Sequence, residues 1–323
     1  MKLHLLAAAA LATVLAAPAL ADQVEYRALI QERDVGYLKL DRQGQKVAVD
    51  YNIKQNGRGP TITEAVTLDK DGAPLAWTIT GRTTFGNAVN ESFKRSAAGA
   101  EWRDLAGPGR IKGKDAPRFY ATQNGSPLDV AMLAKALLAD ADRSMAVAPG
   151  GTARLTERDR RSFDGPDGKL DVVTYELSGL SLNPTYITLD AKGDLFAVAS
   201  AGSILARKGY ERVADKPLRD LAEQLASSRF AQLQSESAKT FSGPVRIRNV
   251  RVFDPKAKAL SALSDVVMSG SRISEVVPAG SIATPGETSV DGEGGTLVPG
   301  MFEMHGHMGQ EDALMNVLAG ITS

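Results

Sequence analysis

Polar and apolar residues alternate along most of the chain, as is typical of β-strands with one buried face. Between residues 22 and 240, alternating runs such as 47–53 are separated by short turn-forming sequences rich in Asp and Gly. Three of these turns lie at 69–72, 165–168 and 190–194. The pattern predicts a mainly β fold with some α, in which 22–240 is a β-rich accessory domain built as an antiparallel sheet or a half-closed barrel.

Two segments of this domain have the spacing of amphipathic helices instead. The first covers 128–138, and the second runs from about Pro217 to residue 236. Proline is well tolerated in the first turn of a helix, which favours a start at Pro217. Residues 239–244 then break the pattern and are the predicted domain boundary.

Beyond this boundary the pattern again predicts strands. Residues 245–254 alternate as one strand, and residues 265–277 read as a hairpin that turns at 269–271. Residues 301–308 alternate as well, and a helical pattern that ends at Gly320 follows them. One face of the predicted strand carries Met301, Glu303, His305 and His307.

His305 and His307 are the candidate metal ligands of the chain. They are two of only three histidines, and side chains two residues apart on a strand leave the same face. Two neutral imidazoles so placed could bind one divalent cation. An isolated His-x-His is more often a pair of surface or hydrogen-bonded histidines, and this is the alternative interpretation.

The residues around this pair resemble the opening of an amidohydrolase-superfamily enzyme. Such enzymes carry a segment of the type D-x-x-G-x-x-L-x-P-G before a histidine-x-histidine signature, and 291–300 reads Asp-Gly-Glu-Gly-Gly-Thr-Leu-Val-Pro-Gly. The resemblance covers 244–323. It implies an amidohydrolase β-sandwich segment at 244–300, followed at 301–323 by the first strand and helix of a TIM-type (β/α)8 barrel.

The resemblance also implies an activity and a cofactor. It implies hydrolysis of an amide or other C–N bond in a small-molecule or peptide-like substrate, as in dipeptidase-like or imidazolone-hydrolase-like members. One or two divalent ions, zinc being expected, would be bound in part by His305 and His307. Glu303 stands where the family most often has aspartate, and is expected to lie behind the ligands rather than to bind metal.

The length of the chain departs from the family. The remaining ligands and the general base come from later barrel strands in such enzymes, whereas this chain ends at Ser323. We therefore expect a truncated amino-terminal part that is inactive alone and in which no catalytic residue can be assigned. The alternative is a non-catalytic periplasmic binding or interaction protein with a vestigial amidohydrolase segment.

The amino terminus predicts export. Lys2 precedes an apolar run at 5–17, and Ala19-Leu20-Ala21 has the small-x-small pattern of a signal-peptidase site. Residues 1–21 are therefore predicted to be a signal peptide cleaved after Ala21, which places the protein in the periplasm or outside the cell. A retained anchor is disfavoured because the run is shorter than the roughly 20 residues that span a bilayer.

Composition limits the possible partners. The 38 basic and 38 acidic residues give zero net charge, which argues against nucleic acid or an anionic membrane surface as a partner. The chain has no cysteine, so disulfides and thiol nucleophiles are excluded. Trp77 and Trp102 are interpreted as packing residues, and the glycine-rich run 107–110 is predicted to be a turn rather than a phosphate loop.

Overall fold

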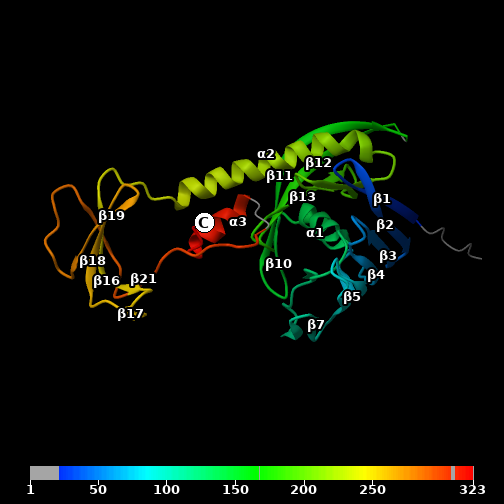
Figure 1. The fold of residues 1–323 in the computed structure, drawn as a ribbon. Helices are drawn as coiled ribbons and strands as arrows, with labels where there is room; N and C mark the ends of the chain where they lie inside the picture. The colour runs from blue at the N-terminus through cyan, green and yellow to red at the C-terminus, as the bar shows by residue number, and fades with distance from the viewer. Residues whose placement is uncertain (1–21, 167, 307–309, 323) are drawn as a thin grey trace, which may run out of the picture. The chain divides into compact units, whose positions relative to one another are not determined.

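A computed structural model gives the fold (Figure 1) and describes residues 22–166, 168–306 and 310–322. The predicted signal peptide and His307 lie outside the described residues. Contacts divide the chain into two compact units, the first ending at Glu223 and the second beginning at Gln224. Among the described helices, none combines the length and the apolar character needed to span a membrane.

The first unit is built on one 15-stranded sheet. The order of strands runs from β8 to β1, continues with β15 and runs back to β9, so neighbours in sequence are mostly neighbours in space. Neighbouring strands are antiparallel except for β9 and β10, which are parallel. The strands are β1 (Asp22–Ile30), β2 (Arg33–Gln43), β3 (Lys46–Ile53), β4 (Thr61–Leu68), β5 (Pro74–Arg82), β6 (Ala88–Ser96), β7 (Gly99–Asp104), β8 (Gly107–Lys112), β9 (Phe119–Tyr120), β10 (Ser144–Ala148), β11 (Thr152–Gly165), β12 (Gly168–Ser178), β13 (Thr185–Asp190), β14 (Leu195–Ala199) and β15 (Ser203–Arg207).

Alternation along the strands places one face of this sheet in the core. On β3, Val47 and Val49 are buried while the residues between and beside them are exposed, and β4 repeats this pattern with Ile62 and Val66. Burying a side chain of this size stabilises the folded state by roughly 1.5–3 kcal/mol. The sheet is therefore held by its inner apolar face as well as by its ladder of hydrogen bonds.

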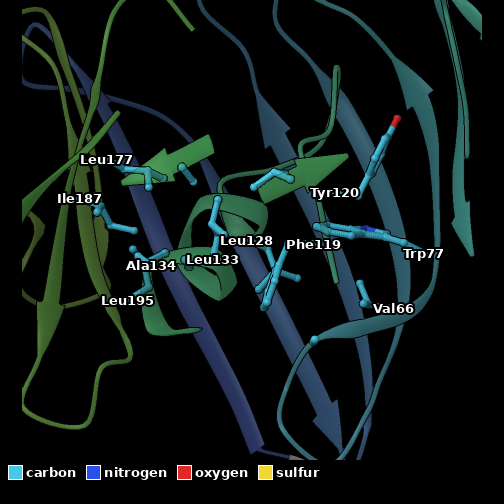
Figure 2. Packing of buried hydrophobic residues seen from close by; sticks show 14 of the residues in the cluster. Val66, Trp77, Phe119, Tyr120, Leu128, Leu133, Ala134, Leu177, Ile187 and Leu195 are labelled. Atoms are coloured by element: carbon cyan, nitrogen blue, oxygen red, sulfur yellow. The ribbon is translucent and has the colours of Figure 1, made fainter. Parts of the chain in front are cut away.

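The inner face curves around α1 (Leu128–Ala139), the helix predicted at 128–138 (Figure 1). Figure 2 shows Leu133 of this helix between the two halves of the sheet, with Trp77 on one side and Ile187 on the other. Leu137 is fully buried in the same cluster. The helix thus fills the hollow that the curved sheet would otherwise leave open.

Two local predictions in the first part of the chain are wrong. Residues 107–110 begin strand β8, and the turn lies just before them at 105–106. Helix α2 (Glu211–Ser237) starts before the predicted Pro217, which lies inside the helix. The first turn of α2 is fixed by packing, since Tyr210 and Ala214 are buried and the Ala214 N–H bonds to the Tyr210 carbonyl oxygen.

The second unit contains a six-stranded sheet around β16 (Val245–Asp254). β16 pairs antiparallel with β17 and β18 and parallel with β20 and β21, while β19 pairs with β18. The predicted strand at 245–254 and the hairpin turn at 269–271 are both present, with Gly270 at a φ of 57°. The remaining elements are β17 (Ala259–Leu260), β18 (Ser264–Ser269), β19 (Arg272–Pro278), β20 (Thr288–Asp291), β21 (Thr296–Leu297) and α3 (Gln310–Leu318).

The predicted fold class is wrong. The described residues are 51% strand and 16% helix, with three helices, and no TIM-type barrel is evident among them. The expected β-sandwich segment is a single six-stranded sheet. The predicted first barrel strand is reduced to an isolated bridge between Met301 and Ile321, because a strand needs a neighbour along its length and the described residues supply one only at Met301.

The two units divide within α2. The boundary predicted from sequence, 239–244, follows the end of α2 at Ser237 and precedes β16. The residues from Glu236 to Ser242 are all exposed.

Candidate functional site

Within the segment 291–300, residues 291–295 form a structured turn that leads into β21 beside β16. The Asp291 carboxylate accepts hydrogen bonds from the Glu293 amide at 2.9 Å and from the Asn249 side chain at 3.1 Å, and these bonds lower the pKa of Asp291. The Gly294 amide donates to the Asn249 carbonyl oxygen at 2.7 Å. The turn is thereby fastened to the bulged part of β16, where the register shifts between Ile247 and Val250.

Two glycines of this turn are required by its geometry. A Cβ on Gly292 would lie 2.1 Å from Cγ1 of Val250 and 2.9 Å from the Arg248 carbonyl oxygen. Gly294 has a φ of 80°, in the left-handed region that favours glycine. The Asp-Gly-x-Gly sequence therefore has a physical role, which is to turn the chain tightly from β20 into β21.

Beyond β21 the chain reaches the candidate histidines. Met301 is held by two backbone bonds, from its amide to the Gly320 oxygen at 2.8 Å and from the Thr322 amide to its own oxygen at 3.0 Å. His305 is exposed in a bend, and its amide donates to Glu303 Oε1 at 2.8 Å. Glu303, expected behind the metal ligands, therefore orders the backbone of this bend.

The described residues do not complete a metal site. No three of their histidine, aspartate and glutamate side chains lie close enough together to hold an ion. His307, the second predicted ligand, lies outside the described residues, so the structure places only one member of the pair. A catalytic zinc site has three protein ligands, and the donor set that is described falls short of this.

A second polar cluster, in the first unit, was not predicted from the sequence. Glu64 on β4 and Glu91 on β6 are each only 1% exposed, on the inner face of the sheet. Both occupy inward positions of an alternating strand, Glu64 between Ile62 and Val66. A charged residue at an inward position was the available signal, because a buried carboxylate must find partners.

Three backbone amides of the loop before α1 and the side chains of Trp77 and Tyr120 supply these partners. Glu91 Oε1 accepts from the Tyr120 hydroxyl at 2.6 Å and from the Gln123 amide at 2.8 Å, and its Oε2 accepts from the Asn124 amide at 3.1 Å. Glu64 accepts from the Ser126 amide and, at 3.0 Å, from Nε1 of Trp77.

These environments shift two pKa values. Burial raises the pKa of Glu64 to about 7, against the opposing hydrogen bonds from Ser126 and Trp77. Burial likewise raises the pKa of Asp129, in the first turn of α1, to about 6. All four oxygens of Glu64 and Glu91 accept bonds from donors of this chain, so the cluster tethers the loop at 120–126 and positions α1 rather than forming a catalytic centre.

Trp77 is a core residue, whereas Trp102 packs on its neighbours and also lines a pocket over β6, β7 and β8. Trp77 is 2% exposed, whereas Trp102 is half-buried against Gly109, with its ring centroid 6.5 Å from that of Tyr120.

Comparison of the chain with protein-family models, with curated proteins and with solved structures finds no match in any of the three.

Proposed function

We propose that this chain carries the amino-terminal part of a metal-dependent amidohydrolase that acts on amide or other C–N bonds. The observation that carries the proposal is the segment 291–307, in which an Asp-Gly-x-Gly-Gly-x-Leu-x-Pro-Gly sequence leads into His-x-His. The conformations of Asp291, Gly292 and Gly294 support it, because these three residues of the motif shape the turn beside β16.

His305 and His307 are proposed as two of the metal ligands. Two imidazoles leave a zinc ion one ligand short of a typical catalytic site, so the complete site needs at least one donor beyond this pair. For the same reason the 323-residue chain is proposed not to hydrolyse amides by itself.

Zinc binding tests this proposal. Zinc binding by the purified chain, its H305A/H307A variant and an E293Q variant is compared by equilibrium dialysis at the same free zinc concentration, with bound metal measured by mass spectrometry. Glu293 is an exposed carboxylate of the same segment and serves as the matched control. Wild type and E293Q are expected to retain zinc that the double variant loses.

Two results would contradict the proposal. Equal zinc content in the double variant and the wild type would remove the histidines from the site. Zinc-dependent cleavage of dipeptides by the wild-type chain would show that it already holds a complete centre.

We also propose that the protein is exported and that its mature form begins at Asp22. The support is the charged start, the apolar run and the Ala-Leu-Ala site in residues 1–21. Expression in a bacterial host followed by intact-mass measurement of the periplasmic fraction tests it. An A21R variant is expected to stay unprocessed, and a cytoplasmic wild-type product that keeps residues 1–21 would refute export.

A further inference from the structure

The first unit contains a cavity of about 370 Å³ between α1 and strands β1 and β2. Its walls are largely apolar: Val24 and Leu40 come from the sheet, and Leu128 and Met132 come from α1. Val24, Leu40 and Met132 are only half-buried, so folding leaves apolar surface on both walls of the cavity. This cavity is remote in sequence from the histidine segment and independent of the proposed hydrolase activity.

The size of the cavity suits a small ligand rather than solvent alone. An apolar cavity of about 150 Å³ already holds a benzene molecule, and ligand pockets begin near 300 Å³. The volume of 370 Å³ therefore admits an alkyl chain as well as a compact ring. Exposed Asp22 and Arg42, cross-strand neighbours on β1 and β2, lie where the cavity opens to water.

The mouth has a rigid lip formed by the turn at 190–194. The Asp190 carboxylate accepts bonds from the amides of Lys192 at 2.9 Å and Asp194 at 3.0 Å, and from Nη2 of Arg207 at 2.9 Å. A salt bridge of 2.6 Å between Lys135 and Asp194 connects this lip to α1. The mouth is thus formed before any ligand arrives.

The charges at the mouth favour an anion. Of the seven charged residues that line the cavity, Lys135 is paired with Asp194 and Arg207 with Asp190. Two cations, Arg42 and Lys192, and one carboxylate, Asp22, remain outside these pairs. Among the described residues, no carboxylate forms a salt bridge with Arg42 or Lys192. Nε of Arg207 is buried and has no hydrogen-bond partner among the described residues. The side chains that line the cavity therefore carry one net positive charge, and Arg207 adds a buried donor without an acceptor in the described part of the chain.

We propose that this cavity binds a small amphipathic anion of the medium-chain fatty-acid type. The alkyl chain lies between Leu40 and Met132, and the carboxylate lies at the mouth near Arg42 and Lys192. Burial of each methylene strengthens binding by about fourfold, so the tail supplies most of the affinity. The exposed cations select an anionic head group and add less, since an exposed ion pair strengthens binding by about fivefold at most.

Calorimetric titration of the full chain tests the proposal with decanoate as the probe and decyltrimethylammonium as the matched cation. M132W and L40W fill the cavity from opposite walls, and L105W adds the same indole at an exposed site outside it. Loss of tail contacts is expected to weaken decanoate binding by roughly tenfold or more in both cavity variants but not in L105W. The R42Q/K192Q variant is expected to lose about two- to fivefold for decanoate only, because exposed charges act weakly.

Several outcomes decide the matter. Weaker binding in M132W or L40W, with an unchanged thermal midpoint, supports the cavity as the site. If both cavity variants unfold, the decanoate affinity of R42Q/K192Q decides, because substitutions at the exposed mouth leave the protein folded. Unchanged affinity in all variants, no binding of decanoate to the wild type, or equal binding of the cation would overturn the proposal.

Discussion

Glu91 shows how one residue can organise a loop. Its two oxygens accept three bonds, from the Tyr120 hydroxyl and from the amides of Gln123 and Asn124. Tyr120 in turn stacks on Phe93, with ring centroids 5.2 Å apart. A single carboxylate therefore joins β6, β9 and the loop that leads into α1.

Removing this carboxylate is expected to destabilise the first unit. Glu91→Ala leaves a buried hydroxyl and two amides without an acceptor, and each such group costs roughly 1–3 kcal/mol. We expect a loss of about 3 kcal/mol in the free energy of unfolding, measured with urea by circular dichroism. Glu101→Ala is the control, because its pair with Arg110 is exposed on both sides. Equal losses in the two variants would contradict this role for Glu91.

The stability of the chain is expected to depend on the protonation of Glu64. Burial raises the pKa of Glu64 from its usual 4.5 to about 7, so the folded state binds the proton more tightly than the unfolded state does. The stabilisation that the protonated Glu64 gives to the folded state is therefore complete below pH 4.5 and is lost as the pH rises through about 7.

The test compares wild type with Glu64→Gln, which does not titrate, at pH 5 and pH 8. From pH 5 to pH 8, the free energy of unfolding of the wild type is expected to fall by on the order of 2–3 kcal/mol more than that of the variant. Urea unfolding at each pH measures this difference. A difference that is constant with pH, or that grows in favour of wild type at pH 8, would show that Glu64 is ionised in the folded protein.

At the scale of elements, alternation predicted strands well wherever a neighbouring strand was available. Residues 245–254 became β16 because β18 and β20 lie along them. Residues 301–307 alternate equally well, but their described part finds a partner only at Met301. A pattern reports which face could be buried, whereas the presence of a covering neighbour is a property of the tertiary structure.

Sequence patterns were likewise unable to reveal the long-range contacts that build the Glu64 cluster and the cavity. The partners of Glu64 include an amide 62 residues away, which no local pattern reveals. The lip of the cavity depends on Arg207 reaching Asp190, 17 residues earlier in the chain. The Asp-Gly turn at 291–295 could be recognised from sequence because its determinants are local, apart from its bonds to β16.

The turn at 291–295 provides a prediction at this scale. Gly292→Ala would place a methyl group 2.1 Å from Cγ1 of Val250, so β16 and β20 must move apart. Overpacking of this kind costs roughly 1–3 kcal/mol. Hydrogen exchange is expected to quicken at the amides of 288–297, whereas Gly202→Ala, whose added Cβ meets nothing within 4 Å, is expected to have no effect. Unchanged protection in Gly292→Ala would contradict the close approach.

At the scale of the whole molecule, the two units differ in how well they cover their apolar residues. The first unit buries a continuous cluster around α1, which includes Leu133, Trp77 and Ile187. The second leaves large side chains such as Ile273, Phe302 and Met304 exposed. A unit with fewer buried contacts opens more readily, so the two are expected to differ in local stability.

Limited proteolysis should reveal this difference. The end of α2 and the connection after it are exposed from Glu236 to Ser242, and the connection contains Lys239, a site for trypsin. Brief digestion is therefore expected to cut first at Lys239 and to leave a stable fragment that ends there, followed by degradation of the part of the second unit beyond Lys239. Mass spectrometry of the time course identifies the fragments, and Lys239→Gln should delay the first cut while leaving later sites unchanged. Early cleavage within β1–β15, or survival of the second unit alongside the first, would show that the packing of the first unit does not govern resistance.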